Sequence, residues 1–298
     1  MKRRSFLGYA CLFLASCTAA QQQRNAGSST ATASLPEPLR FAVTDVSGLE
    51  ELEADYKPFR QALEAALETT IEFFPIDSPV AAAPAMLTGE IDLAWAGPSE
   101  YLILQARAKA VPVVSLKRSD FKSVIAVRSD SGIQSIADLK GKAIDMYKPG
   151  STSTYIGGSQ MLLAAGLDPT TDVQIVTSGS FSLDILKRGE VDAVVRASHR
   201  YQTVIEAENL AVSDYPIIAT GELLPGDIFI ANNQLDSMVV KTIQTKMLEH
   251  QDQLMAAILE TPNLAKKFSN ASLILVDTNK YKMFREVYKA INQESLIN

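Results

Sequence analysis

The sequence predicts an α/β fold built from two similar halves, and two observations carry this prediction. From Leu39 onward, short runs of β-branched or aromatic residues alternate with segments of helical period, which is typical of helices packed around a largely parallel sheet. In addition, Gly89-Glu90-Ile91-Asp92 is echoed by Gly189-Glu190-Val191-Asp192. Each copy is expected to end a helix and start an apolar strand, as duplicated lobes would, although such a junction can also recur by chance.

The expected strands share an apolar, β-branched or aromatic composition and are Leu39–Val43, Thr70–Phe74, Ile91–Trp95, Val111–Leu116, Val124–Val127, Ala143–Met146, Val173–Val176, Val191–Val195 and Phe229–Ala231. A helix is expected at Asp55–Leu67, because Phe59, Leu63 and Leu67 recur at helical spacing on one face. A second helix is expected to open at Ser151 and to continue through Gln160–Ala165.

The composition is that of a folded protein with a large core. The chain has 298 residues, of which 47% are hydrophobic and 21% charged, so one or two domains are expected and disorder is not. The formal net charge is -6 and the basic residues form no block or stripe, so nucleic acid is not an expected partner. The two cysteines, Cys11 and Cys17, precede the folded part, which is therefore expected to contain no disulfide.

The N-terminus is typical of an exported lipoprotein. Basic residues 2–4 precede the apolar run Phe6–Leu14, which is too short for a permanent membrane span. Leu14-Ala15-Ser16-Cys17 resembles the bacterial lipobox, so residues 1–16 are expected to be a signal peptide and Cys17 to carry a lipid anchor. An ordinary signal peptide with an incidental cysteine is the alternative, and the paired arginines leave the twin-arginine route open. Residues 17–38 are expected to form a flexible tether.

The candidate binding residues follow strands. In open α/β sheets ligands bind beyond the carboxyl ends of strands, so Trp95–Ser99 and Arg196–Ser198, which follow the echoed segments, are expected to face a common cleft. Ser151, Thr152 and Ser153 lie where a helix is expected to begin, and their hydroxyls and free backbone N–H groups predict an anion site. The alternative reading is a simple N-cap, which accounts for only one hydroxyl.

At this point a family resemblance becomes specific. Ser131–Lys142 followed by Pro149–Ser153 resembles the phosphate/phosphite/phosphonate-binding proteins of ABC importers. Further stretches that resemble the same family are Tyr56–Phe59, Ile91–Pro98 with Tyr101, Ser178-Gly179-Ser180 and Pro225-Gly226-Asp227. The resemblance covers roughly Leu39 to Leu235.

The resemblance implies the type II periplasmic binding fold, with two lobes that are each a mixed sheet flanked by helices. It places two crossings between lobes near Val127 and Ile228, which assigns residues 39–127 and 228–298 to lobe 1 and residues 128–227 to lobe 2. The family has no cofactor and no catalytic activity. By resemblance, Ser151, Thr152 and Ser153 hold the phosphonate oxygens.

Further site residues are implied less directly. By resemblance Tyr101 is a cleft tyrosine and Ser180 a ligand contact, whereas Trp95 could line the cleft or pack in the core. The sequence departs from the family in two regions, because Phe181 follows Ser-Gly-Ser where His is usual and Arg196 stands where an acidic or amide group is usual.

Arg196 has only hydrogen-bond donors, so we expect it to pair with a fully ionised oxyanion or a carboxylate, and we expect aminophosphonates to bind poorly. A surface ion pair of Arg196 with Glu190 or Asp192 is the alternative. His199 is expected to be a solvated or capping histidine.

The expected function is that of a monomeric extracytoplasmic solute-binding lipoprotein of an ABC importer, on the periplasmic side or the outer face of the cytoplasmic membrane. It would capture a phosphonate, phosphite or phosphate by closure of the lobes and deliver it to a permease with its ATPase. A sulfonate or another small organic anion, or a role as a ligand sensor, is the alternative. No catalytic residue or metal ligand is expected, because nucleophile-elbow, zinc-protease and P-loop motifs are absent and only two histidines occur.

Overall fold

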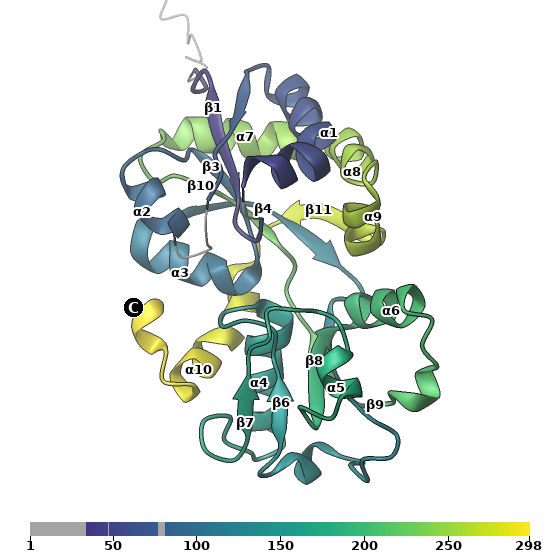
Figure 1. The fold of residues 1–298 in the computed structure, drawn as a ribbon. Helices are drawn as coiled ribbons and strands as arrows, with labels where there is room; N and C mark the ends of the chain where they lie inside the picture. The colour runs from purple at the N-terminus through teal and green to yellow at the C-terminus, as the bar shows by residue number, and fades with distance from the viewer. Residues whose placement is uncertain (1–33, 47, 77–80) are drawn as a thin grey trace, which may run out of the picture. The chain divides into compact units, whose positions relative to one another are not determined.

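The computed structural model describes residues 34–46, 48–76 and 81–298, whose helices and strands are drawn in Figure 1. The expected signal peptide, the lipidation of Cys17 and nearly all of the expected tether lie outside the described residues. Among the described residues, no helix combines the length and apolarity needed to cross a membrane.

The first sheet has the strand order β11-β4-β10-β3-β1-β2. Its strands are β1 (Leu39–Val43), β2 (Ile71–Phe73), β3 (Leu93–Ala96), β4 (Val111–Arg118), β10 (Ile228–Ala231) and β11 (Ala271–Leu275). β1 pairs in parallel with β2 and β3, whereas β10 and β11 run antiparallel to their neighbours, so the sheet is mixed.

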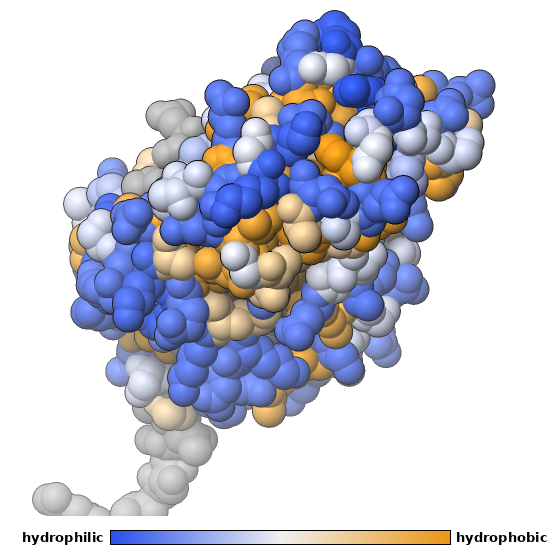
Figure 2. All heavy atoms as spheres, turned by 90° about the horizontal axis from the view of Figure 1, so that it is seen from below, coloured by the Kyte–Doolittle hydropathy of each residue, from blue (hydrophilic) through white to orange (hydrophobic). Residues whose placement is uncertain are grey.

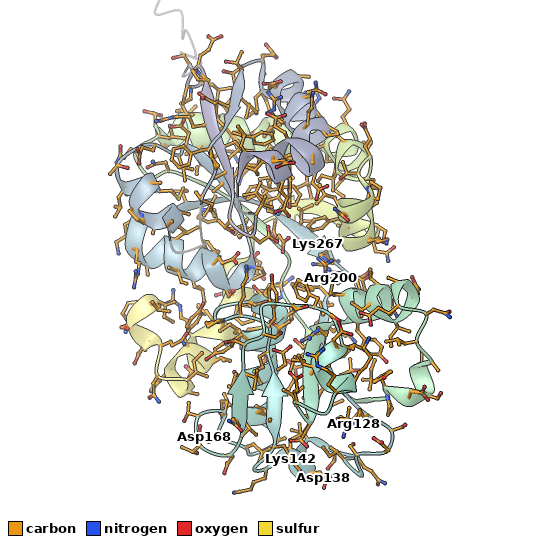
Figure 3. All side chains as sticks on the ribbon, in the orientation of Figure 1. Arg128, Asp138, Lys142, Asp168, Arg200 and Lys267 are labelled. Atoms are coloured by element: carbon orange, nitrogen blue, oxygen red, sulfur yellow. The ribbon has the colours of Figure 1, made fainter. Side chains whose placement is uncertain are left out.

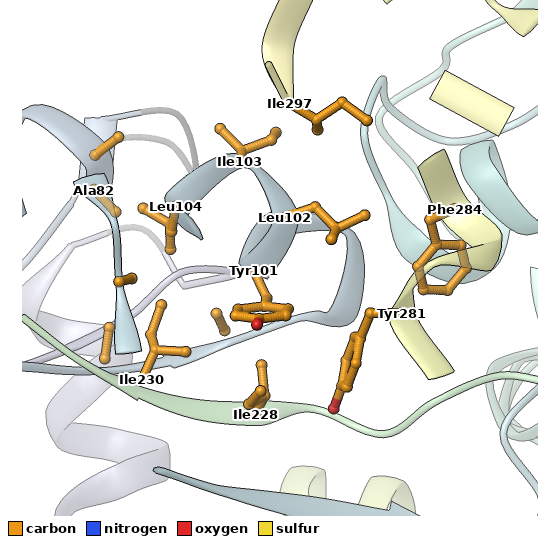
Figure 4. Close-up of a cluster of buried hydrophobic side chains, with 14 of the residues drawn as sticks. Ala82, Tyr101, Leu102, Ile103, Leu104, Ile228, Ile230, Tyr281, Phe284 and Ile297 are labelled. Carbon is orange, nitrogen blue, oxygen red and sulfur yellow. The ribbon is translucent and has the colours of Figure 1, made fainter. Parts of the chain in front are cut away.

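Side-chain alternation along these strands gives the first sheet two buried faces. Phe41 and Val43 of β1 join one apolar cluster and Ala42 joins another, because successive residues point to opposite faces. The first face is covered by α1 (Leu49–Leu67), α7 (Ser237–Glu249), α8 (Gln251–Ile258) and α9 (Pro262–Phe268). The second face is covered by α2 (Ala82–Leu87), α3 (Pro98–Ala108) and the C-terminal α10 (Met283–Ala290), and Figure 4 shows part of this cluster.

The second sheet has the order β7-β6-β8-β5-β9. Its strands are β5 (Lys122–Val127), β6 (Ala143–Asp145), β7 (Gln174–Val176), β8 (Ala193–Ala197) and β9 (Ile217–Leu223). The helical segments of this half are η2 (Ile136–Leu139), η3 (Thr152–Ile156), α4 (Gly157–Ala164), α5 (Asp184–Lys187), α6 (Ser198–Ala207) and η4 (Val212–Asp214), while η5 (Thr278–Tyr281) and η6 (Glu294–Leu296) flank α10. Helix α4 packs on one face of the sheet, and α5 and α6 pack on the other.

The two sheets repeat one strand arrangement, because β7-β6-β8-β5-β9 has the same succession of parallel and antiparallel pairs as β2-β1-β3-β10-β4. The echoed segments occupy equivalent places. Asp92 accepts a hydrogen bond from the backbone N–H of Arg40 at 2.9 Å, and Asp192 accepts one from Ala143 at 2.9 Å, so the two carboxylates fix the starts of the equivalent strands β1 and β6. The prediction of two similar halves is therefore confirmed, and chance recurrence is not needed.

The chain passes between the sheets at two places. The first connection, residues 119–121, precedes β5, which pairs antiparallel with β8 and β9, so the crossing expected near Val127 and the lobe 1 boundary at 127 were wrong. The residues of β5 do not by themselves tell which sheet the strand joins, and only its pairing with β8 and β9 assigns it to the second sheet. The second connection, residues 224–227, falls where the crossing near Ile228 was expected. Residues 228–298 are not confined to the first half, because α10 also packs against η3 and α4.

The strands expected from the sequence are all present, with ends shifted by a few residues, whereas β9 and β11 were missed. Both missed strands lie at sheet edges and alternate little between buried and exposed positions, so their pattern is weak. The large apolar side chains that stay exposed come from elements scattered along the chain, and Figure 2 shows apolar and polar side chains interspersed on one face.

Candidate functional site

A cavity of about 300 Å³ lies where elements of both sheets meet. It is lined by Asp45, Val46, Glu51, Asp55, Tyr56, Gly97, Glu100, Phe121, Tyr147, Lys148, Ser151, Thr152, Ser153, Phe181, Ala197, His199, Arg200, Asp227, Asn263, Leu264 and Lys267. Gly97 directly follows β3, and Ala197 is the last residue of β8; these are the strands that follow the two echoed segments. Both positions agree with the rule that ligands in open α/β sheets bind beyond the carboxyl ends of strands. Figure 3 shows Lys267 and Arg200 close together at the level of the cavity, whereas Asp138 and Asp168 lie far from it.

The second sheet contributes the start of a helix. Ser151, Thr152 and Ser153 all line the cavity at the beginning of η3, which continues into α4. The first N–H groups of a helix have no acceptor within it, so this end presents unpaired donors and the positive end of the helix dipole. The backbone is held in place from below, because Ser123 Oγ donates to the carbonyl oxygen of Ser153 at 2.6 Å.

One of the three hydroxyls is used to join the two halves. Ser99 Oγ donates to the carbonyl oxygen of Gly150 at 2.7 Å, and Ser99 N–H donates to Thr152 Oγ1 at 3.2 Å. The two hydroxyl oxygens are 2.8 Å apart. Since the single Ser99 hydroxyl proton points to Gly150, Thr152 donates to Ser99 Oγ. The hydroxyls of Ser151 and Ser153 make no hydrogen bond to the described residues and are therefore available to a ligand in the cavity.

A lysine and two carboxylates face this helix start from the first half. Lys267 Nζ lies 3.0 Å from both Asp45 Oδ2 and Asp227 Oδ2. Burial alone would lower the pKa of Lys267, but the charges of Asp227 and Asp45 outweigh it and the pKa is raised. Burial would likewise raise the pKa of Asp45, but Lys267 lowers it. Lys267 and Asp45 are therefore both charged at neutral pH.

Glu100 adds a carboxyl group of a different kind. Burial, with a contribution from the charge of Asp45, raises its pKa to about 7. Its Oε2 accepts hydrogen bonds from Thr44 Oγ1 at 2.8 Å and from the N–H of Gly97 at 2.7 Å. At neutral pH this group therefore exists in comparable amounts as acid and as carboxylate.

His199 is a cavity residue and not the solvated or capping histidine that was expected. Its Nδ1 lies 3.0 Å from Arg118 Nη2, and a guanidinium can only donate, so Nδ1 is the acceptor and Nε2 carries the proton. Burial, followed by the charge of Arg118, lowers the pKa of His199 to about 2. The imidazole is thus a neutral hydrogen-bond donor at Nε2.

Aromatic rings form another wall of the cavity. Tyr147 and Phe181 stack with ring centroids 3.9 Å apart, and the Arg200 guanidinium lies 4.7 Å from the centre of the Phe181 ring. Tyr147 has a φ of 63°, in the left-handed region that bulky residues rarely adopt. Such strain is concentrated at functional sites, because it persists only where the surroundings impose it.

Arg196 does not line the cavity, so the hypothesis that it pairs with the ligand was wrong. Its side chain is fully buried and Nη2 lies 2.7 Å from Asp145 Oδ2, whose side chain is also fully buried. Nη2 also donates to the carbonyl oxygens of Ser180 and Ser182, while Nε and Nη1 donate to those of Phe181 and Val195. The alternative partners Glu190 and Asp192 were wrong as well. Alternation along β8 explains the misplacement, since Arg196 points to the same sheet face as Val194. The expectation that aminophosphonates bind poorly loses its support.

Tyr101 and Trp95 are core residues. Tyr101 is 1% exposed and its ring meets that of Tyr281 edge to face at 5.0 Å (Figure 4). Trp95 is 2% exposed and packs against Phe229 with ring centroids 4.8 Å apart. Of the two readings left open for Trp95, the structure supports core packing.

Ser180 is exposed but does not line the cavity. Its carbonyl oxygen accepts from Arg196, and its Oγ accepts from the N–H of Ser182. The neighbouring Phe181 reaches the cavity instead.

Several cavity residues were missed by sequence reasoning. Asp45 follows the carboxyl end of β1, and the rule that predicted Gly97 also applies to it. Glu100 lies in the first turn of α3, directly after an echoed strand. Lys267 lies on α9, beyond the resemblance, and carries no local signal. Among the described residues, no group of three or more His, Cys, Asp or Glu side chains is arranged to hold a metal ion.

Comparisons with known proteins agree on one family. The family model for the periplasmic substrate-binding protein of phosphonate ABC transporters matches residues 41–273. The chain is 24% identical over 234 residues to the phosphate-import protein PhnD of Mycolicibacterium smegmatis, an alignment that covers 73% of each protein.

Solved structures confirm the fold. PhnD1 of Prochlorococcus marinus in complex with methylphosphonate is similar with a TM-score of 0.69 at 17% identity, over 87% of this chain and 100% of that chain. The alkanesulfonate-binding protein SsuA of Xanthomonas axonopodis pv. citri bound to MOPS has a TM-score of 0.61 at 20% identity, over 89% and 96% of the two chains. The predicted two-lobed fold of type II periplasmic binding proteins is thereby confirmed. The family serves transport and is not an enzyme family, and the chain belongs to it: it is a member of the phosphonate-binding periplasmic substrate-binding proteins of ABC transporters.

Proposed function

We propose that the chain captures a phosphonate, phosphite or phosphate in the cavity, with the oxyanion at the start of η3. The observation that carries this proposal is that Ser151, Thr152 and Ser153 line one cavity together with groups from the other half. Helix N-termini bind anions through unpaired N–H groups and the dipole, and the hydroxyls of Ser151 and Ser153 add donors. The neutral Nε2–H of His199 supplies a further donor without adding a charge.

The aromatic wall favours a phosphonate among these oxyanions. Tyr147, Phe181, Phe121 and Leu264 give the cavity apolar surface, which an organic substituent can cover and inorganic phosphate cannot. Methylphosphonate in the complex of the Prochlorococcus PhnD1 and the phosphate import of the mycobacterial PhnD support the same ligand class.

Transport would depend on closure of the two halves. A ligand that contacts both halves would stabilise a closed form, and a permease with its ATPase would recognise that form. We further propose that the protein is monomeric, acts by binding without catalysis, and is held at the membrane by a lipid on Cys17, on the strength of the lipobox resemblance.

The second candidate function is binding of a sulfonate or another small organic anion, or ligand sensing. The similarity to the alkanesulfonate-binding protein favours it, because that protein shares the fold and a tetrahedral anionic ligand group would meet the same donors. The two candidates differ in the ligand that stabilises the folded protein.

Calorimetric titration of the purified protein with methylphosphonate, phosphite, phosphate, sulfate and methanesulfonate tests the proposal. Binding of a phosphorus oxyanion should weaken in Ser151→Ala and in Ser153→Ala, by about 1–3 kcal/mol each, because the charged ligand loses a hydrogen bond. Thr242→Val is the matched control, since that hydroxyl lies on α7 and bonds only to the carbonyl oxygen of Met238. Binding that is confined to sulfur oxyanions would contradict the main proposal and support the second candidate.

A further inference from the structure

Glu100 is a buried carboxyl group at the point where an anion is expected to bind. It lines the cavity, and both of its hydrogen bonds go to Oε2, which leaves Oε1 without one among the described residues. A Cβ added to Gly97 would lie 2.5 Å from Glu100 Oε2 and 3.4 Å from Thr152 Oγ1, so the carboxyl group and the start of η3 border the same small space. An oxyanion on η3 therefore has Glu100 as a close neighbour.

An ionised Glu100 would oppose that ligand. Two negative charges a few ångströms apart in a buried site repel strongly, and one of them is usually neutralised by a proton. Lys267 does not offset this repulsion, because its ammonium group already lies between Asp45 and Asp227. A protonated Glu100 would reverse the interaction, since its O–H can donate to a ligand oxygen.

The charged and titratable groups around Glu100 come from every element that lines the cavity or packs behind it. They are Asp45 after β1, Glu51, Asp55 and Tyr56 on α1, Arg118 on β4, Tyr147 and Lys148 before η3, His199 and Arg200 on α6, Asp227 before β10, Lys267 on α9 and Tyr288 on α10. The pKa of Glu100, already raised to about 7 by burial and then by Asp45, must rise further when a negative ligand arrives. The pKa of His199 is lowered to about 2, so that group stays neutral at alkaline pH.

We propose that Glu100 is a ligand-contacting residue that binds the oxyanion through one proton taken up from solvent, and that it thereby determines which protonation state of the complex is stable. The inference rests on the proposed function and deepens it. The ligand class is a small oxyacid anion with an oxygen free to share a proton with a carboxyl group. When the ligand has no titratable oxygen, the proton stays on the Glu100 carboxyl group. When the ligand is a phosphonate, the proton is on either the Glu100 carboxyl group or a phosphonate oxygen.

The test counts protons during binding. Titrations of the purified protein at pH 8.5 in buffers of different ionisation enthalpy give the number of protons bound per ligand. With methylphosphonate, which is mainly a dianion at this pH, the wild-type protein should take up about one proton and Glu100→Gln about none. The Gln side chain keeps an oxygen for Thr44 and Gly97 and donates its N–H to the ligand. Glu72→Gln is the matched control, because it makes the same change on an exposed position of strand β2, away from the cavity, and should leave the count at about one.

A ligand with no titratable group shows whether the proton is bound by Glu100 or by the ligand. If methanesulfonate binds, its affinity should fall by about tenfold per pH unit between the pKa of Glu100 in the free protein, about 7, and its higher pKa in the complex, and this slope should vanish in Glu100→Gln. Methylphosphonate binding with no proton uptake by the wild-type protein, or with an uptake that persists in Glu100→Gln, would overturn the inference and leave the proposed function standing. Failure of every oxyanion to bind would instead overturn the proposed function and the inference with it.

Discussion

Arg196 is predicted to stabilise the fold and not to bind the ligand, and Arg196→Met separates the two roles. The substitution removes the donor that lies 2.7 Å from Asp145 Oδ2 and leaves a buried carboxylate without its counter-charge. Removing one partner of a buried ion pair typically costs 3–5 kcal/mol. Two backbone donors remain at Asp145 Oδ1, the N–H groups of Tyr147 at 3.2 Å and Ser178 at 3.0 Å, so the lower end applies.

We therefore expect Arg196→Met to lower the free energy of unfolding by about 3 kcal/mol, or roughly a hundredfold in the folding equilibrium, as measured by urea denaturation. Arg196→Met combined with Asp145→Leu should recover part of this loss, because no unpaired charge remains. Oxyanion affinity should change by less than about tenfold, through loosening of the loop that carries Phe181. Unchanged stability together with a large loss of affinity would refute the structural role and restore Arg196 as a ligand contact.

Four further predictions follow from the described contacts. Gly226→Ala should abolish soluble expression or lower the melting temperature sharply, because its Cβ would lie 1.6 Å from a backbone carbonyl oxygen of β4. Trp95→Ala should destabilise the fold by about 3–5 kcal/mol in urea denaturation, and a loss of affinity without loss of stability would show that the ring lines the cleft. His199 should show the Nε2–H tautomer and no titration between pH 5 and 8 in ¹⁵N NMR, and substitution of Arg118 should allow the other tautomer as well. Because the pKa of His199 is depressed from 6.5, the neutral imidazole stabilises the fold fully above pH 6.5, and this stabilisation is lost as the pH falls below 6.5. Because the pKa of Glu100 is raised, its protonated form stabilises the fold fully below about pH 4.5, and this stabilisation is lost as the pH rises through about 7. In melting experiments, the stability of Glu100→Gln relative to wild type should therefore be higher at pH 8 than at pH 5. An equal difference at both pH values would contradict this.

The fold was largely predictable because its signals are local. The echoed Gly-Glu-aliphatic-Asp segments marked equivalent strands correctly, since Asp92 and Asp192 make the same backbone bond in each sheet. The boundary near Val127 was misjudged because sheet membership depends on pairing partners that are distant in sequence. Edge strands such as Ile217–Leu223 are partly exposed on both faces, which erases the alternation that identifies a strand.

The sequence predicted the parts of the candidate site whose position depends on the backbone, at helix starts and strand ends, but not those that depend on side-chain direction. The hydroxyls at the start of η3 and the region after each echoed strand were placed in the cavity, because helix ends and strand ends fix the position of the chain. Side-chain direction was not predictable at Arg196 and Trp95, since one residue of register decides between cleft and core. Lys267 comes from the C-terminal part of the chain, and only the tertiary fold brings it to Asp45.

A crystal structure of the purified protein with methylphosphonate tests the central proposal most directly. We expect the phosphonate oxygens to lie within hydrogen-bond distance of the backbone N–H groups at the start of η3 and of the hydroxyls of Ser151 and Ser153, with the methyl group toward Tyr147 and Phe181. A phosphonate bound elsewhere, with the start of η3 filled only by water, would contradict it.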